Sequence, residues 1–176
     1  YLSRARPSTM QGRIFDLGKG GVFPGKKAGD EATGTRVEPL SEDARLAFDN
    51  AGRVHAYFAQ MFSRRGVRDA DGPAPMEAYV QYGDLAGAYW CKSKSFECPA
   101  PGVMVYGPKF ARAVDVIGHE VTHGVITEEA DLVYADEPGA VNEALADIFG
   151  TLIEFHARGS DGTANWVLGE DLPGFS

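Results

Sequence analysis

The residues with the clearest chemical potential are His119 and His123, which stand four positions apart, with Glu120 directly after the first of them. On a helix, residues four apart lie one turn above each other on the same face, so both imidazoles can reach one metal ion. Glu120 would project in a neighbouring direction, where it can act on a metal-bound water without ligating the metal. The spacing therefore predicts a metal-binding helix that carries a general base. The alternative is a pair of surface or capped histidines.

A third ligand follows twenty residues after His123, where Glu143 stands in the run Asn-Glu-Ala-Leu-Ala-Asp. A carboxylate from an adjacent helix would complete a two-His, one-Glu site and leave the fourth position to water, which is typical of catalytic zinc. A purely structural zinc would need a fourth protein ligand, and none is spaced for it. Asp147, four residues beyond Glu143, could accept the outer N–H of His119 and fix its tautomer. Taken separately, the two acids would be ordinary solvated charges on a helix.

Hydrophobic spacing predicts the elements that must hold these residues. An early helix over residues 43–65 would follow the N-cap Ser41 and end at Gly66, and two late helices would carry the predicted ligands. The short runs before the late helices are rich in aromatic and β-branched residues, which favours antiparallel strands. We therefore expect an α+β fold in which an antiparallel, sheet-rich N-terminal part precedes two zinc-bearing helices. The predicted strands are 13–17, 21–23, 76–82, 88–91 and 103–106, the late helices are 111–128 and 137–157, and residues 160–176 are an acidic loop.

Composition limits the class of protein. The chain has 176 residues, with 17 Lys and Arg against 25 Asp and Glu, which gives a formal net charge of −8. This length fits one domain, and the acidic balance argues against nucleic acid or an anionic membrane as a partner. No run of about 18 apolar residues is present, so no membrane span is expected. The chain starts at Tyr1 without an initiator Met and ends shortly after Pro173, which suggests a processed or cut product.

The two cysteines, Cys91 and Cys98, flank six residues that are mostly polar. This spacing can close a small hairpin disulfide in an oxidising compartment and matches no common zinc-ligand spacing. We expect the disulfide, as a structural cross-link rather than as part of the chemistry.

A longer run resembles a known family. Residues 115–152, DVIGHEVTHGVITEEADLVYADEPGAVNEALADIFGTL, are similar to the active-site segment of the thermolysin-like zinc metalloendopeptidases, or gluzincins. Weaker similarity covers Ala-Tyr-Trp at 88–90, Met-Val-Tyr-Gly at 104–107 and the acidic run at 165–171, so the likeness extends over residues 76–173. The resemblance implies the N-terminal catalytic portion of such an enzyme.

Roles follow from this resemblance position by position. It implies zinc ligation by the two histidines and Glu143, a base and proton shuttle at Glu120, and a supporting carboxylate at Asp147. Tyr134 matches a tyrosine that donates a hydrogen bond to the oxyanion, whereas without the family context a half-buried tyrosine closing a loop would explain it. The backbone of Ala88 would pair with an extended substrate, and Val116 and Leu168 would line an apolar pocket for the residue after the cut.

Calcium is a further implication of the resemblance. The family's calcium carboxylates correspond to Asp115, Glu154 and Glu170. Asn165 and Val167 stand where relatives with paired calcium ions usually carry acidic residues, so we expect one Ca²⁺ rather than two. An acidic loop without an ion is the alternative.

Two departures concern the substrate cleft. Gly87 stands where the family normally has an Asn that contacts the substrate backbone. The family's helical C-terminal domain, which supplies a His and an Arg to the oxyanion and the far wall of the cleft, has no counterpart in residues 1–176. His55 and His156, the remaining histidines, are better explained by their own helices than as replacements.

The function expected from these patterns is a secreted or extracellular zinc-dependent endopeptidase that acts on polypeptides and prefers an apolar residue after the cut. The alternative is a zinc-binding but inactive or weakly active fragment. Such a fragment would need a missing C-terminal domain or a partner chain to complete its cleft.

Overall fold

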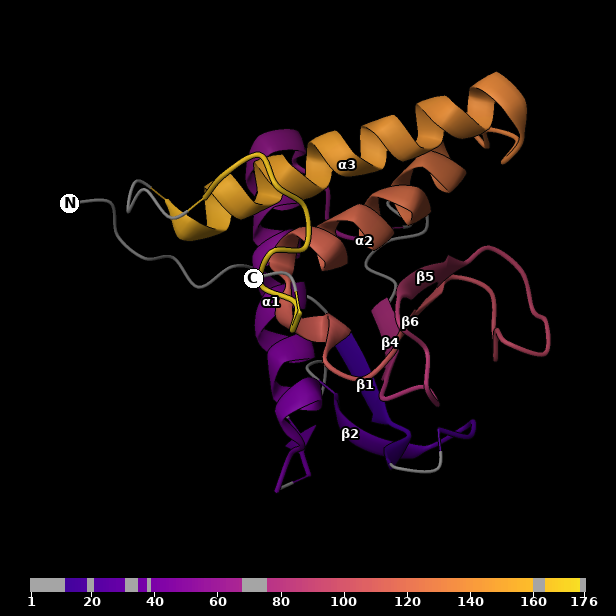
Figure 1. The fold of residues 1–176 in the computed structure, drawn as a ribbon, viewed down its shortest axis with the longest axis vertical. Coiled ribbons are helices and arrows are strands. Elements are labelled where there is room, and N and C mark those ends of the chain that lie inside the picture. Colours follow the sequence, from indigo (N-terminus) through magenta and orange to yellow (C-terminus); the bar gives the residue numbers. More distant parts are fainter. Residues whose placement is uncertain are drawn as a thin grey trace.

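A six-stranded sheet and three α-helices form the fold in this computed structural model, which describes residues 12–18, 21–30, 35–37, 39–67, 76–159 and 164–174. The strand order is β3-β2-β1-β4-β6-β5, so β5 lies at one edge of the sheet. Helices α2 and α3 run side by side, and α1 crosses behind them (Figure 1). The strands are β1 Gly12–Asp16, β2 Lys26–Asp30, β3 Thr35–Arg36, β4 Met76–Val80, β5 Ala88–Cys91 and β6 Val103–Tyr106.

The helices are α1 Glu42–Phe62, α2 Val114–Glu129 and α3 Asp136–Arg158. The predicted N-cap of α1 is confirmed, because the Ser41 hydroxyl accepts the Ala44 N–H at 3.1 Å. This helix ends at Phe62, three residues before the predicted last residue 65, since Ser63 adopts a left-handed conformation with φ 56°. Helix α2 also begins later than predicted, because Ala113 is extended and a short 3-10 turn precedes it at Phe110–Arg112.

The direction of the strands differs in part from the prediction. The pairs β1–β2, β2–β3 and β5–β6 are antiparallel, whereas β1–β4 and β4–β6 are parallel. The parallel pairs arise because the chain crosses over between them, through α1 in one case and through β5 in the other. Residues 21–23 form no strand, and β2 follows them instead at Lys26–Asp30. The α+β class itself is confirmed.

Side chains of the central strands alternate between two cores. Ala78 and Met104 point to the face covered by α1 and α2, while Tyr79 and Val105 point to the other face, which aromatic side chains and the cysteine pair cover. In the edge strand, Trp90 packs on the helix-covered side and Cys91 on the opposite side. The helices that carry the predicted ligands therefore lie on one face of the sheet, next to its β5 edge.

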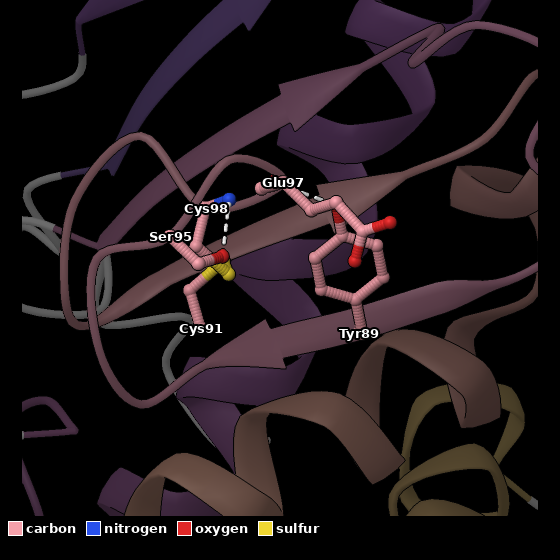
Figure 2. The surroundings of a disulfide bond; sticks show 5 residues. All are labelled: Tyr89, Cys91, Ser95, Glu97 and Cys98. Carbon is pink, nitrogen blue, oxygen red and sulfur yellow. Dashed lines mark hydrogen bonds between the residues drawn. A yellow bond between two sulfur atoms is a disulfide. The ribbon is translucent and has the colours of Figure 1, made fainter.

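The predicted disulfide is confirmed. Cys91 and Cys98 are bonded with their Cα atoms 5.6 Å apart, at the end of β5 (Figure 2). The enclosed turn is further held by the Cys98 N–H, which donates to Ser95 Oγ at 3.1 Å, and by the Tyr89 hydroxyl, which donates to the Glu97 carbonyl at 2.8 Å. These bonds fix the connection between β5 and β6 from both ends.

Among the helices that the structure describes, none is long and apolar enough to cross a membrane.

Candidate metal centre and active site

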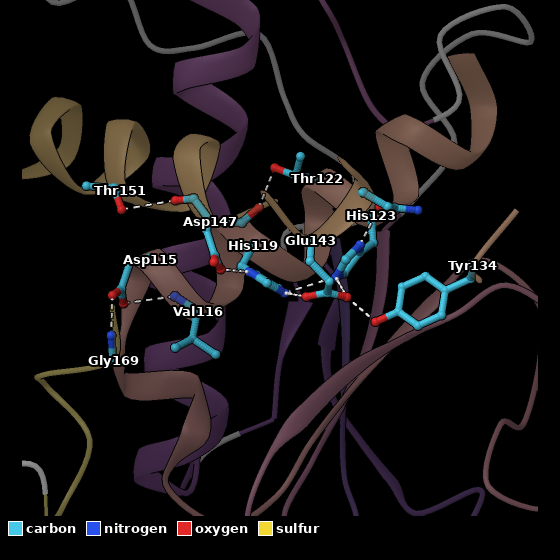
Figure 3. A network of polar contacts seen from close by, with 12 residues as sticks. Asp115, Val116, His119, Thr122, His123, Tyr134, Glu143, Asp147, Thr151 and Gly169 are labelled. Atoms are coloured by element: carbon cyan, nitrogen blue, oxygen red, sulfur yellow. Dashed lines mark hydrogen bonds and ion pairs between the residues drawn. The ribbon is translucent and has the colours of Figure 1, made fainter. Parts of the chain in front are cut away.

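Helices α2 and α3 bring three possible metal ligands together. His119, His123 and Glu143 each offer a donor atom, and these atoms all lie within 4.8 Å of one another. The two imidazole Nε2 atoms are 2.9 Å apart, and the two Glu143 oxygens lie 3.4 Å from them, Oε2 from His119 and Oε1 from His123. Figure 3 shows the three side chains pointing toward one another between the two helices.

The outer nitrogens of both imidazoles are already engaged. His119 Nδ1 lies 2.9 Å from Asp147 Oδ1, and His123 Nδ1 lies 2.7 Å from Asn142 Oδ1. Because both partners are acceptors, each Nδ1 carries the hydrogen and each Nε2 presents a lone pair to the shared point. Two facing lone pairs beside a carboxylate repel unless a cation lies between them. The donor set therefore fits a divalent cation.

Burial supports the neutral form of His119. Desolvation lowers the pKa of His119, and the neighbouring His123 lowers it further, against the opposing effect of Glu143 and Asp147. A neutral imidazole is the form that ligates a metal ion.

Asn142 had no role predicted from the sequence. Its position next to Glu143 was the only sign in the sequence that it could reach the site, because its contact with His123 depends on how α2 and α3 pack.

Replacing Asp147 by Asn is expected to weaken metal binding by about 10- to 100-fold, because the amide is a poorer acceptor for the His119 Nδ1–H and leaves the ring less basic. A zinc titration against a competing chelator measures this change. Asp84→Asn, at an exposed turn away from the site, serves as the control. Equal zinc affinity in the two variants would contradict the orienting role of Asp147.

Glu120 lies in the same cavity but does not join the donor set. The cavity has a volume of about 450 Å³ and is lined by both histidines, Glu143 and Glu120. The Glu120 side chain is buried, and burial raises its pKa to about 8, with the charge of Glu143 adding to the rise and a hydrogen bond from the Trp90 N–H opposing it. A nearby divalent cation would lower this pKa. Glu120 is thus a buried carboxylate that can exchange a proton near neutral pH.

Tyr134 reaches the site from the connection between α2 and α3. Its side chain is 65% exposed, so it is not the half-buried, loop-closing residue of the alternative interpretation. Its hydroxyl donates a hydrogen bond to Glu143, and this bond is the main reason that the pKa of Tyr134 rises to about 12 (Figure 3). Tyr134 therefore remains a protonated donor at the mouth of the cavity.

The edge strand β5 forms another wall of the cavity through Ala88, Tyr89 and Trp90. The carbonyl of Cys91 accepts a hydrogen bond from the Gly102 N–H on the side of β6, whereas the Trp90 N–H donates to Glu120 on the opposite, open side of the strand. Because alternate residues of a strand present their backbone groups on the same side, those of Ala88 also face the cavity. An extended peptide could pair with this edge.

Two predicted substrate-binding residues lie elsewhere. Neither Val116 nor Leu168 lines the described cavity. They lie instead near the glycines where α2, α3 and the C-terminal segment meet: a Cβ added to Gly150 would be 3.3 Å from Leu168, and one added to Gly169 would be 3.7 Å from Val116. Val116 nonetheless lies one turn before His119 on α2, and the substrate-binding roles of both residues stay predictions.

A second acidic cluster joins α2, α3 and the C-terminal segment. Carboxylate oxygens of Asp115, Glu154 and Glu170 lie within 4.8 Å of one another, and the first two residues are each 1% exposed. Desolvation raises the pKa of Glu154 to about 7, although Arg158, whose Nη2 lies 2.6 Å away, lowers it. Asn165, which stands where relatives with paired calcium ions carry an acidic residue, donates a hydrogen bond to the Glu170 carboxylate at 2.9 Å and so stabilises that carboxylate. The cluster is rich in negative charge that Arg158 only partly balances.

The two remaining histidines make local contacts. His55 Nε2 lies 3.2 Å from the Arg65 carbonyl oxygen, and His156 Nε2 lies 3.0 Å from Gln60 Oε1. Neither histidine lines the cavity.

An open two-His, one-Glu donor set with a buried carboxylate beside it is typical of metal-dependent hydrolases. Comparison with known families agrees with this class. Residues 28–127 match the model of the thermolysin metallopeptidase catalytic domain, and residues 130–174 match that of the thermolysin metallopeptidase alpha-helical domain. The second match includes α3 and Glu143, so residues 1–176 do contain a counterpart to part of the helical domain that was expected to be absent. The chain belongs to the thermolysin metallopeptidase family.

Individual relatives support the same assignment. Bacillolysin of Bacillus cereus is 37% identical over 123 residues, which cover 69% of this chain and 20% of that protein. Protease PrtS of Photorhabdus sp. (strain Az29) is 33% identical over 177 residues, which cover 93% of this chain and 43% of that protein. The chain therefore spans less than half the length of either relative. The precursor of protealysin, a metalloproteinase from Serratia proteamaculans, is similar in structure with a TM-score of 0.77 and 30% identity, over 97% of this chain and 52% of that one.

Proposed function

We propose that this chain is the N-terminal catalytic portion of a secreted, zinc-dependent endopeptidase. The observation that carries the proposal is the convergence of two imidazole Nε2 lone pairs and the Glu143 carboxylate in the cavity that also holds buried Glu120. Two nitrogen donors with one carboxylate, and no fourth protein ligand among the described residues, suit Zn²⁺ at a catalytic site. The disulfide supports an oxidising, extracellular location.

Zinc held by His119, His123 and Glu143 would activate water and polarise the peptide carbonyl. The protein's own groups divide the remaining tasks. Glu120, which the cation would keep ionised by lowering its raised pKa, accepts the proton of the attacking water and returns it to the amide nitrogen that leaves, for which its position beside the donor set is suited. The Tyr134 hydroxyl, released from Glu143, donates a hydrogen bond to the oxygen that becomes negative.

Substrate binding in this proposal uses the edge of β5. The outward backbone groups of Ala88 hold the peptide in an extended form beside Glu120. We also propose that the enzyme prefers an apolar residue directly after the cut. Leu132 supplies apolar surface to the cavity, whereas Val116 and Leu168 would contribute only where the pocket extends beyond the described cavity.

A second candidate function is a zinc-binding fragment with little activity of its own. Apolar side chains on α3 and the C-terminal segment favour it, because Val141 and Ile148 are each 50% exposed and Trp166 is 75% exposed. Such a surface fits burial by a C-terminal domain or a partner chain. The cleft would then be complete only in the assembled protein.

Hydrolysis of casein and of an internally quenched peptide by the purified chain separates the two candidates. The first predicts cleavage that a chelator abolishes and added zinc restores. Zinc binding without cleavage would favour the second. A chain that binds no zinc would contradict both.

We also propose one Ca²⁺ at Asp115, Glu154 and Glu170, supported by their convergence and by the hard oxygen donors. Calcium should raise the melting temperature more at pH 8 than at pH 6. The pKa of Glu154 is about 7 in the folded chain and 4.5 in the unfolded chain, so between these two pH values the folded chain binds more protons. Without calcium, the free energy of unfolding therefore falls as the pH rises from 4.5 to about 7. Above pH 7 the cluster is ionised and a cation relieves its repulsion.

Thermal unfolding with and without calcium at the two pH values tests this site. Glu154→Gln should lose most of the calcium-dependent shift. Glu137→Gln, an exposed change on the same helix, should keep it. An equal shift in both variants would place the calcium elsewhere.

A further inference from the structure

One basic side chain stands out on the wall of the cavity. Lys92 follows β5 directly, and it is the only Lys or Arg among the described residues that line the cavity. The other ionisable groups there are the two histidines, Tyr89, Tyr134, Glu120 and Glu143. The positive charge of Lys92 therefore has no role in the hydrolytic chemistry described above.

The position of Lys92 is set by the strand and by the disulfide. Side chains of a strand alternate between its faces, so Lys92 follows Trp90 on the side of α2 and the cavity. The Trp90 ring marks that side, since a Cβ added to Gly124 of α2 would lie 3.0 Å from it. Between them, Cys91 is fully buried on the opposite face and bonded to Cys98 (Figure 2). The backbone at Lys92 is thus held at the end of the cleft.

The present partner of Lys92 leaves its charge available. Lys92 Nζ lies 2.6 Å from Asp131 Oδ1, in the connection between α2 and α3. The two side chains are 52% and 74% exposed, and an exposed pair of this kind contributes little. An ammonium group also has three donors, so it can bind a second carboxylate while it keeps the first.

Direction along the strand decides which part of a peptide meets Lys92. Glu120 contacts the edge at Trp90, and Lys92 lies two residues further along, or roughly 6.6 Å at strand spacing. A peptide that pairs antiparallel to β5, as β6 does on the other side of this strand, has its N-terminal part toward Lys92 and its C-terminal part toward the start of β5. Lys92 then faces the residues before the scissile bond.

We propose that Lys92 makes the cleft select peptides with an acidic side chain two or three residues before the scissile bond. This inference rests on the proposed function, because it concerns the substrate of that same site. Lys92 would thus determine specificity through its positive charge and not through the length of its side chain alone.

Paired quenched peptides that differ only by Glu or Gln at each of these positions test the proposal with the full chain. We expect kcat/KM to favour Glu by about three- to fivefold, as for one exposed ion pair. Lys92→Glu should reverse the preference, a change of about tenfold in the ratio, and 0.5 M salt should reduce it in the unchanged chain. Asp131→Asn should increase the preference, because it removes the competing carboxylate.

Lys94→Glu is the matched control. It makes the same charge change two residues away in the same disulfide-closed turn, at an exposed position outside the cavity lining. The Glu-to-Gln ratio should stay as in the unchanged chain. Equal shifts in the Lys92 and Lys94 variants, or no shift in either, would overturn the proposal.

Binding of the same peptides, labelled with a fluorophore and followed by anisotropy in the Glu120→Gln variant, separates this inference from the proposed function. A preference for Glu that Lys92→Glu reverses supports the role of Lys92 even if the unchanged chain cleaves nothing. Cleavage without a charge preference would overturn the role of Lys92 and leave the endopeptidase proposal standing.

Discussion

Replacing Glu120 by Gln is expected to lower peptide hydrolysis by about a thousandfold while the zinc content stays unchanged. Gln has nearly the same shape as Glu but cannot accept a proton from water at neutral pH. Glu120 stands beside the donor set rather than in it, so the ligands remain. Hydrolysis of a quenched peptide gives kcat/KM, and elemental analysis of the same sample gives the zinc content.

Glu137→Gln provides the control, because it makes the same chemical change at an exposed position in the first turn of α3. Its activity should equal that of the unchanged chain. A Glu120→Gln variant that still cleaves at the unchanged rate would show that another group moves the proton. Loss of zinc together with activity would mean that Glu120 supports the metal site itself.

Replacing His123 by Ala should remove both zinc and activity. Only two donors would remain, and the Nε2 of His119 would face a gap where its partner nitrogen stood. Zinc should then no longer stabilise the fold. For the unchanged chain, zinc at a thousand times its dissociation constant should add about 4 kcal/mol to the free energy of unfolding. Elemental analysis and thermal unfolding with and without zinc measure the two effects.

His156→Ala is the matched control for this variant. It removes an imidazole from the same pair of helices, but its ring contacts Gln60 and not the cavity. It should keep about one zinc ion per chain and the zinc-dependent rise in melting temperature. If the His123 variant binds zinc as tightly as the His156 variant, the centre does not use His123.

The elements next to the site were predictable because local patterns define them. Strands β5 and β6 have the predicted bounds, and the Ser41 cap begins α1 as its side-chain chemistry requires. The disulfide was also predictable, because the short spacing between its cysteines allows a hairpin to close. In contrast, β2 has the sequence Lys-Lys-Ala-Gly-Asp, which favours no strand, and pairing with β1 and β3 on its two sides produces it.

The direction of β4 was not predictable, since strand propensity carries no direction and the parallel pairs depend on crossovers through distant segments. The substrate-binding roles of Val116 and Leu168 stay predictions for a related reason. Their side chains are apolar, but the face of α2 that borders the cavity is fixed by its packing against β5 and α3.

The sequence by itself determined that His119 and His123 share a helical face, because a four-residue spacing has one geometry on any helix. It also determined that Glu120 is adjacent to the pair without being part of it. The tertiary structure decided the rest. How closely the predicted Glu143 approaches the imidazoles, that Asn142 orients His123, and which charge lies at the end of β5 all depend on contacts between segments far apart in the chain. Such contacts are set by how the whole core packs, and no local pattern encodes them.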